Sequence, residues 1–140
     1  MTNTYNLKLF CDGGSRGNPG PAAYGYVIYD HAGNILEKCG NYLGVATNNQ
    51  AEYEGLIAGV RFVTEHYPGA HLDITMDSLL IVNQVKGLYK VKNPGLLLKY
   101  HEVKLLLSRV KSYTISHTYR SDNSLADSLV NQALDSQSQV

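Results

Sequence analysis

The sequence contains no tryptophan and only two cysteines among its 140 residues. Cys11 and Cys39 form no Cys-x-x-Cys pair and show no Cys/His spacing typical of zinc ligands, so buried thiols in a reducing compartment are the simpler interpretation. The chain also contains no Gly-x-Ser-x-Gly sequence, no plausible Cys/His catalytic pair and no Walker loop. These absences exclude the common protein nucleophiles and nucleotide-binding loops.

Long apolar segments are absent as well. No apolar run approaches the roughly 18 residues of a membrane span, and no basic segment followed by an apolar one opens the chain. We therefore expect a cytoplasmic protein that does not associate with membranes. The chain is 44% hydrophobic and 17% charged, as in a globular protein. We expect one domain over residues 1–135, a frayed polar tail over residues 136–140, and a monomer in the absence of any oligomer signal.

The formal net charge is zero, with 12 basic and 12 acidic residues, but the charges are unevenly distributed. Residues 1–77 carry four bases and eight acids, whereas residues 78–120 carry eight bases and one acid. This distribution favours a carboxylate-rich region beside a region that meets phosphates. Solvated helix faces explain any single lysine equally well.

Hydrophobic periodicity predicts an α/β fold. Alternating residues predict strands over 7–12, 22–30, 35–43, 72–77 and 113–119, with the first strand ending at Asp12 in a glycine-rich turn. Helical spacing and capping signals predict helices over about 49–66, 78–86 and 94–108, and a last helix capped by Asn123 or Ser124. Leu79, Val82 and either Val85 or Ile81 are expected to face the core in the helix over 78–86. In the last helix, the expected core residues are Leu125, Leu129 and either Val130 or Ala133.

Four acids occupy comparable places in this pattern. Asp12 and Asp77 end strands, and Glu52 and Asp127 fall in the first turns of helices. A solvated hairpin aspartate and a glutamate favoured by the helix dipole are the ordinary alternatives. If the first and fourth strands pair in parallel, the two strand-end acids become neighbours, and clustered carboxylates need a counter-charge. Oxygen ligands suit Mg²⁺ or Mn²⁺, and two such ions can cleave a phosphodiester without a protein nucleophile.

Four motifs together resemble those of a type 1 ribonuclease H across nearly the whole chain. They are Asp12-Gly-Gly-Ser-Arg-Gly-Asn-Pro-Gly, Thr47-Asn-Asn-Gln-Ala-Glu52, Asp77-Ser78 and Asn123-Ser-Leu-Ala-Asp127. The resemblance implies a five-stranded mixed sheet of order 3-2-1-4-5, with strand 2 antiparallel and helices on its faces. It implies endonucleolytic cleavage of the RNA strand of RNA/DNA hybrids, leaving 5′-phosphate and 3′-hydroxyl ends.

The same resemblance assigns roles to the four acids. Asp12 would bridge two Mg²⁺ or Mn²⁺ ions bound together with substrate, Glu52 and Asp77 would hold the ion on the leaving-group side, and Asp127 would hold the ion that carries the attacking water. Asn48 and Asn49 would read ribose 2′-hydroxyls, which separate RNA from DNA. The remaining implied substrate contacts are Ser15, Asn18, Thr47, Asn93, Lys86, Lys90 and Arg120, of which Thr47 and Asn93 are equally good helix N-caps.

Three departures from the better-known bacterial members are visible. The connector 87–93 carries lysines but no basic protrusion, which predicts a weaker grip on the substrate with Leu88 or Tyr89 as a substitute contact surface. The loop 120–123 has no histidine, and Arg120 resembles the arginine of relatives that lack it. Val45 stands where some members have an arginine for the phosphate pocket.

Other readings remain open from the sequence. A module that binds RNA/DNA hybrids without cutting them would have no use for four clustered acids. A phosphatase or phospho-receiver would need Asp-x-Asp after the first strand or a strand-end lysine, whereas Asp12 is followed by two glycines. Resolvases and transposases of this fold usually carry further domains. We therefore expect a metal-dependent endoribonuclease.

Overall fold

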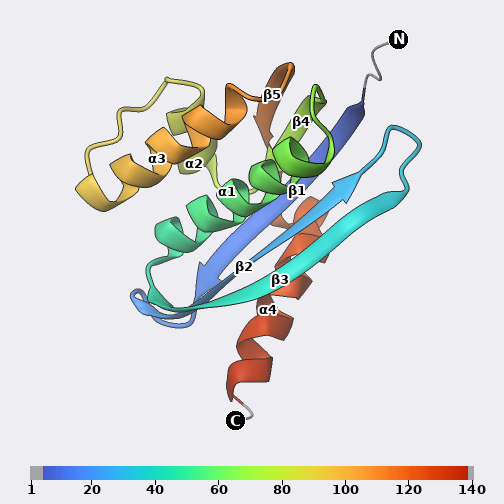
Figure 1. Ribbon diagram of the computed structural model, residues 1–140. Helices are drawn as coiled ribbons and strands as arrows, with labels where there is room; N and C mark the ends of the chain where they lie inside the picture. Colours follow the sequence, from blue (N-terminus) through green and yellow to red (C-terminus); the bar gives the residue numbers. More distant parts are fainter. Residues whose placement is uncertain (1–4, 139–140) are drawn as a thin grey trace.

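The computed structural model describes residues 5–138 and contains one five-stranded sheet with helices on both faces (Figure 1). The strands are β1 (Asn6–Ser15), β2 (Gly20–Tyr29), β3 (Ile35–Ala46), β4 (His71–Met76) and β5 (Ser112–His117). Their order is β3-β2-β1-β4-β5, with β2 antiparallel to β1 and β3, and with β4 parallel to β1 and β5. The predicted strand order is confirmed.

Three helices pack on one face of the sheet and one on the other (Figure 1). The first face carries α1 (Asn48–His66), α2 (Leu79–Val85) and α3 (Pro94–Leu107), and a short 3-10 helix η1 (Arg120–Asn123) leads into α4 (Ser124–Ser138) on the opposite face. The main core lies between the sheet and the first group. A smaller apolar cluster under α4 joins Ala23 of β2 to Val130 and Leu134.

The predicted helix caps are present. Thr47 accepts a hydrogen bond from the backbone N–H of Gln50 at 3.2 Å, and the Gln50 side chain accepts one from the Thr47 backbone N–H at 2.9 Å. Asn93 caps α3 by accepting from the N–H groups of Gly95 and Leu96. Because α1 begins at Asn48, its first turn contains no acid, and the expectation that Glu52 lies in that turn is wrong.

The first strand is longer than expected. It continues through Asp12 to Ser15, because Gly13 and Gly14 pair with Tyr24 and Ala23 of β2 instead of forming a turn. The parallel ladder with β4 ends at Cys11, which pairs with Met76. Asp12 is therefore the first residue of β1 beyond the end of β4, although it is not the last residue of its own strand.

Several residues are more exposed than the sequence pattern predicts. Leu79 is 49% exposed, because Ile81, Val82 and Val85 form the inner side of α2. Tyr119 lies beyond β5 and is 76% exposed. In α4 the buried positions are Ala126, Val130 and Leu134. Val130 is among the expected core residues, whereas Leu125 and Leu129 are half-buried.

The predicted tail begins inside α4, since residues 136–138 continue this helix, and residues 139–140 lie outside the described part of the chain. Within residues 5–138, no helix combines the length and the apolar character needed to cross a membrane.

Candidate active site

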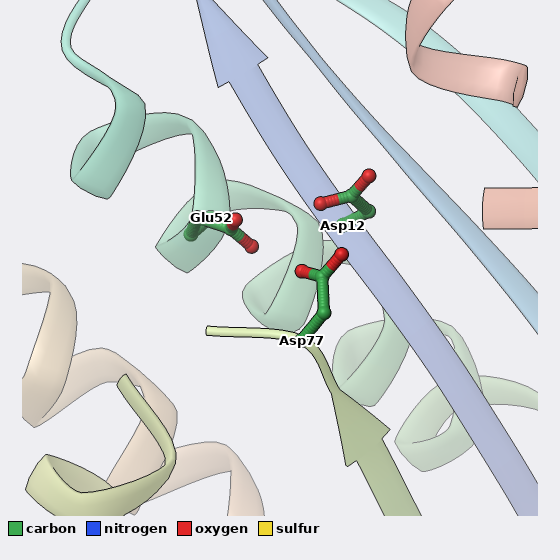
Figure 2. A group of neighbouring side chains, drawn as sticks. All are labelled: Asp12, Glu52 and Asp77. Atoms are coloured by element: carbon green, nitrogen blue, oxygen red, sulfur yellow. The ribbon is translucent and has the colours of Figure 1, made fainter. Parts of the chain in front are cut away.

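Three carboxylates converge at the end of β4 (Figure 2). Asp12 comes from β1, Glu52 from α1, and Asp77 from the residue after β4, and one oxygen of each lies within 4.8 Å of the others. Figure 2 shows the three side chains pointing toward one another. The structure thus brings together three of the four acids that the sequence predicts, as one compact group.

Glycines allow α1 to approach β1 at this point. A Cβ on Gly13 would lie 2.2 Å from the carbonyl carbon of Ala51, and a Cβ on Gly55 would lie 2.6 Å from the Asp12 carbonyl oxygen. No side chain fits between these backbones. This direct contact carries Glu52, the residue after Ala51, to the side of Asp12.

Burial shifts the ionisation of the cluster. Loss of solvent, together with the charges of Asp77 and Asp127, raises the pKa of Asp12 to about 7, although the hydrogen bond from the Gly13 N–H at 2.9 Å acts in the opposite direction. Burial, followed by the charges of Asp12 and Asp77, also raises the pKa of Glu52 well above its ordinary value, and Arg120 opposes this effect. Without a cation, the group is electrostatically strained.

Two buried oxygens of this cluster have no hydrogen-bond partner among the described residues. They are Glu52 Oε2 and Asp77 Oδ2. Unpaired buried acceptors cost free energy, and a divalent cation would satisfy both oxygens and reverse the repulsion between the carboxylates. The donors are all carboxylate oxygens, which suits hard cations such as Mg²⁺ or Mn²⁺. The residues present therefore fit a metal site.

Asp127 lies beside this group, not inside it. It is half-buried in the first turn of α4, and its charge contributes to the raised pKa of Asp12. Asn131, one helical turn later, places its Nδ2 3.4 Å from Asp127 Oδ2. A cavity of about 440 Å³ opens beside these acids and is lined by Asp12, Glu52, Asp127, Asn48, Arg16 and Arg120.

The first loop and the start of α1 are joined by a polar network. Asn48 Oδ1 accepts hydrogen bonds from the Ser15 backbone N–H at 2.9 Å and from the Ser15 hydroxyl at 3.1 Å. Asn18 Oδ1 accepts from the Asn48 backbone N–H at 3.0 Å. Three of the predicted substrate residues thus form one unit on the rim of the cavity, and Asn49 follows them half-buried on α1.

The other predicted contacts lie around this unit. The starts of α1 and α3 are adjacent, since a Cβ on Gly95 would lie 3.2 Å from Asn93 Oδ1 and 3.7 Å from Gln50 Nε2. This places the caps Thr47 and Asn93 in one region. The remaining cations are exposed: Lys86 at the end of α2, Lys90 in the connector, and Arg120, whose Nε lies 3.8 Å from Asp77 Oδ2.

The structure adds site residues that the sequence did not suggest. Arg16 lines the cavity and forms an ion pair with Asp135 of α4 at 2.6 Å. Asn131 contacts Asp127, and its spacing of four residues on a helix is a signal that could have identified it. Asn123 does not act as a helix cap; it is buried and donates from Nδ2 to the Cys11 carbonyl oxygen at 3.0 Å.

This sheet order, with a carboxylate cluster at the end of the parallel strands, defines a ribonuclease H-like domain. A family model described as reverse transcriptase-like matches residues 10–133. A bifunctional protein of Mycobacterium tuberculosis is 42% identical over 135 residues, which are 95% of this chain and 36% of that protein. Ribonuclease HI of Halobacterium salinarum is 39% identical over 92% of this chain and 64% of its own length.

Solved structures agree with these relatives. The N-terminal ribonuclease H domain of the mycobacterial protein has a TM-score of 0.92 at 39% identity and covers 96% of this chain and 97% of that one. LC11 ribonuclease H1, solved in complex with an RNA/DNA hybrid, has a TM-score of 0.89 at 40% identity and covers 94% of this chain and 98% of that one. The chain belongs to the type 1 ribonuclease H family, within the reverse transcriptase-like group. It spans only part of the mycobacterial relative, as the 36% coverage shows.

Proposed function

We propose that this chain hydrolyses the RNA strand of RNA/DNA hybrids endonucleolytically, leaving 5′-phosphate and 3′-hydroxyl ends. The observation that carries the proposal is the group of three carboxylates within 4.8 Å, two of whose buried oxygens have no hydrogen-bond partner among the described residues, in a member of the ribonuclease H family. The hybrid-bound structure of the 40% identical LC11 ribonuclease H1 supports the choice of substrate.

The acids are proposed to hold Mg²⁺ or Mn²⁺, with two ions in the presence of substrate. Asp12, Glu52 and Asp77 form the compact part of the site, and Asp127 adds a carboxylate on the side of α4. Bound metal would supply an activated water and charge stabilisation of the leaving oxygen. Arg120, which is exposed beside Asp77, is proposed to contact a phosphate at the edge of the site.

Recognition of RNA is proposed to depend on Asn48. Because its Oδ1 accepts two hydrogen bonds from Ser15, the orientation of its amide group is fixed and Nδ2 is left to donate to the substrate. A ribose 2′-hydroxyl can accept such a bond, whereas DNA offers no equivalent oxygen. Asn49 and Asn18 complete this rim, and the adjacent caps Thr47 and Asn93 are proposed to contact a phosphate of the DNA strand.

The test is cleavage of an end-labelled RNA/DNA hybrid by the purified chain with Mg²⁺, Mn²⁺ or EDTA. Single-stranded RNA, duplex RNA and duplex DNA of the same sequence are the substrate controls, and Asp77→Asn is the site control. Metal-dependent cutting of the hybrid's RNA strand alone, lost in the variant, is the expected result. If the folded wild type retains the hybrid on a gel but leaves it whole with either metal, the chain is a non-cleaving binding module and the proposed activity is wrong.

We further propose that the chain acts as a monomer, since every carboxylate of the site comes from this one chain. Sedimentation equilibrium in the presence and absence of hybrid measures this directly. Two chains on each short hybrid, with activity rising steeply with protein concentration, would contradict it.

A further inference from the structure

Two glycines form a groove across the sheet beside Asp12. Gly25 of β2 pairs with Asp12, and Gly40 of β3 pairs with Gly25, so these three residues form one row across the strands. A Cβ on Gly25 would lie 2.7 Å from the Ala126 carbonyl oxygen, and a Cβ on Gly40 would lie 2.6 Å from the Leu129 carbonyl oxygen. The α4 backbone therefore lies directly on the backbones of β2 and β3.

The two contacts bracket Asp127 along α4. Ala126 precedes Asp127 and Leu129 follows it by two residues, so the depth to which α4 enters the groove sets the height of the Asp127 carboxylate above the row that contains Asp12. Any side chain larger than hydrogen in the groove would lift α4. The two glycine contacts set the depth of α4, but by themselves they do not set its position along the row.

Asn123 supplies a fixed point against sliding. Its side chain is 2% exposed, and Nδ2 donates to the carbonyl oxygen of Cys11, the residue before Asp12, at 3.0 Å. This hydrogen bond joins positions 112 residues apart in the sequence. Asn123 is also four residues before Asp127, so the bond connects the start of the helix that carries Asp127 to the strand that carries Asp12.

The amide oxygen of Asn123, Oδ1, argues against a role in stability alone. Asn123 Oδ1 is buried and has no hydrogen-bond partner among the residues that the structure describes. An unpaired buried acceptor reduces stability, so an apolar side chain of the same size would fill this position with less cost. Compared with an apolar side chain of that size, asparagine adds the hydrogen bond from Nδ2 to the Cys11 carbonyl oxygen.

We propose that Asn123 is a positioning residue, which together with the Gly25–Gly40 groove holds Asp127 in the place where it can share a metal with Asp12. The inference deepens the proposed function and rests on it, because Asp127 needs an exact position only if metal binds between the two carboxylates. Removal of a group that holds a metal ligand in place typically changes metal affinity or activity by about 10- to 100-fold.

The test uses Asn123→Leu, which keeps the size of the side chain and removes both the donor and the unpaired acceptor. Two measurements are made: kcat and KM on an RNA/DNA hybrid, and the Mg²⁺ dependence of the backbone amide NMR signals of Asp12 and Asp127. We expect kcat to fall by about tenfold or more with KM within about twofold of wild type. We also expect the Asp127 signal to need more Mg²⁺ than it does in the wild type. The control is Ser121→Ala, because Ser121 is an exposed residue of the same 3-10 helix. This variant should leave the kinetic constants and the Mg²⁺ dependence of the NMR signals unchanged.

A second variant tests the proposal even if Asn123→Leu does not fold. Gly40→Ala lifts α4 from the edge strand while η1 keeps its wild-type sequence, and it should reproduce the loss in kcat and the altered Mg²⁺ response at Asp127. A wild-type Mg²⁺ response at Asp127 in whichever of the two variants folds would overturn the proposal. If the wild type fails to cut the hybrid but the variants still change the Mg²⁺ response, the positioning role stands and the proposed activity fails.

Discussion

Gly13 of β1 and Ala51 of α1 are in contact through their backbones, at a distance that leaves room for no side chain: a Cβ on Gly13 would lie 2.2 Å from the Ala51 carbonyl carbon. Gly13 follows Asp12 and Ala51 precedes Glu52. The contact between two small residues therefore sets the separation of two acids that the sequence places 40 positions apart.

We predict that Gly13→Ala destabilises the protein by about 3 kcal/mol or more, because the strand and the helix must separate to admit the methyl group. The matched control is Gly14→Ala, whose Cβ would lie 3.8 Å from Val130 Cγ1, an ordinary van der Waals distance. Urea unfolding of both variants measures the difference. Equal stability of the two variants would contradict the close contact.

We predict opposite effects of Asp77→Asn in the absence and presence of metal. In EDTA at neutral to alkaline pH, the variant should be more stable by roughly 1 kcal/mol, because the Asp77 charge is the largest charge effect on buried Asp12. With Mg²⁺, the stabilisation that wild type gains should be lost together with cleavage. Urea unfolding with EDTA and with Mg²⁺ tests both statements, with Asp122→Asn as an exposed control of equal charge change. Lower stability of Asp77→Asn in EDTA would show that the carboxylates do not repel.

We predict that the metal-free protein loses stability as pH rises from about 4 to 7. The pKa of Asp12 is about 7 in the folded protein and 3.8 ordinarily, so the folded state favours the protonated form, and that advantage disappears as pH passes through this range. Stabilisation by Mg²⁺ should follow the opposite trend, because the ligands must be ionised. Thermal unfolding across this range, with EDTA or Mg²⁺, provides the measurement. The Asp12→Asn variant should remove most of the slope in EDTA; an unchanged slope would assign it to other groups.

We predict that Ser15→Ala raises KM for the hybrid by about fivefold with little change in kcat. The variant loses one of the two hydrogen bonds that orient Asn48, and a net hydrogen bond contributes about 1 kcal/mol. Steady-state kinetics on one hybrid measures both constants. Ser116→Ala on β5 is the exposed control. A loss confined to kcat would mean that Ser15 acts on the reacting groups and not on binding.

We predict that Lys86→Ala combined with Lys90→Ala reduces the salt dependence of hybrid binding. Each lysine that contacts a phosphate should lower the slope of log affinity against log salt by about 0.9 or slightly less. Binding is measured with a metal-site variant, so that the hybrid remains intact. Lys38→Ala, on the edge strand β3, removes a charge elsewhere and should leave the slope as it is. An unchanged slope in the double variant would place the substrate away from α2 and the connector.

Local sequence alone determined much of the architecture. The capping box at Thr47, the Asn93-Pro94 start of α3 and the positions of the four acids depend on short-range signals: alternation, helical spacing and side chains that pair with neighbouring backbone groups. The strand order is implied by the resemblance to type 1 ribonuclease H and not by these local signals. The sequence also placed Asp77 at the end of the fourth strand, one residue beyond the observed end of β4 at Met76.

Only the tertiary structure decided how the acids are arranged. Pairing with β2 extends β1 beyond Asp12, and the glycine contacts that seat α1 and α4 join residues far apart in the chain. The same holds for Asn123, which looked like a helix cap in the sequence and instead bonds to Cys11. Local patterns can show that a glycine or an asparagine is present, but its partner is chosen by packing between distant segments, and that packing sets the geometry of the site.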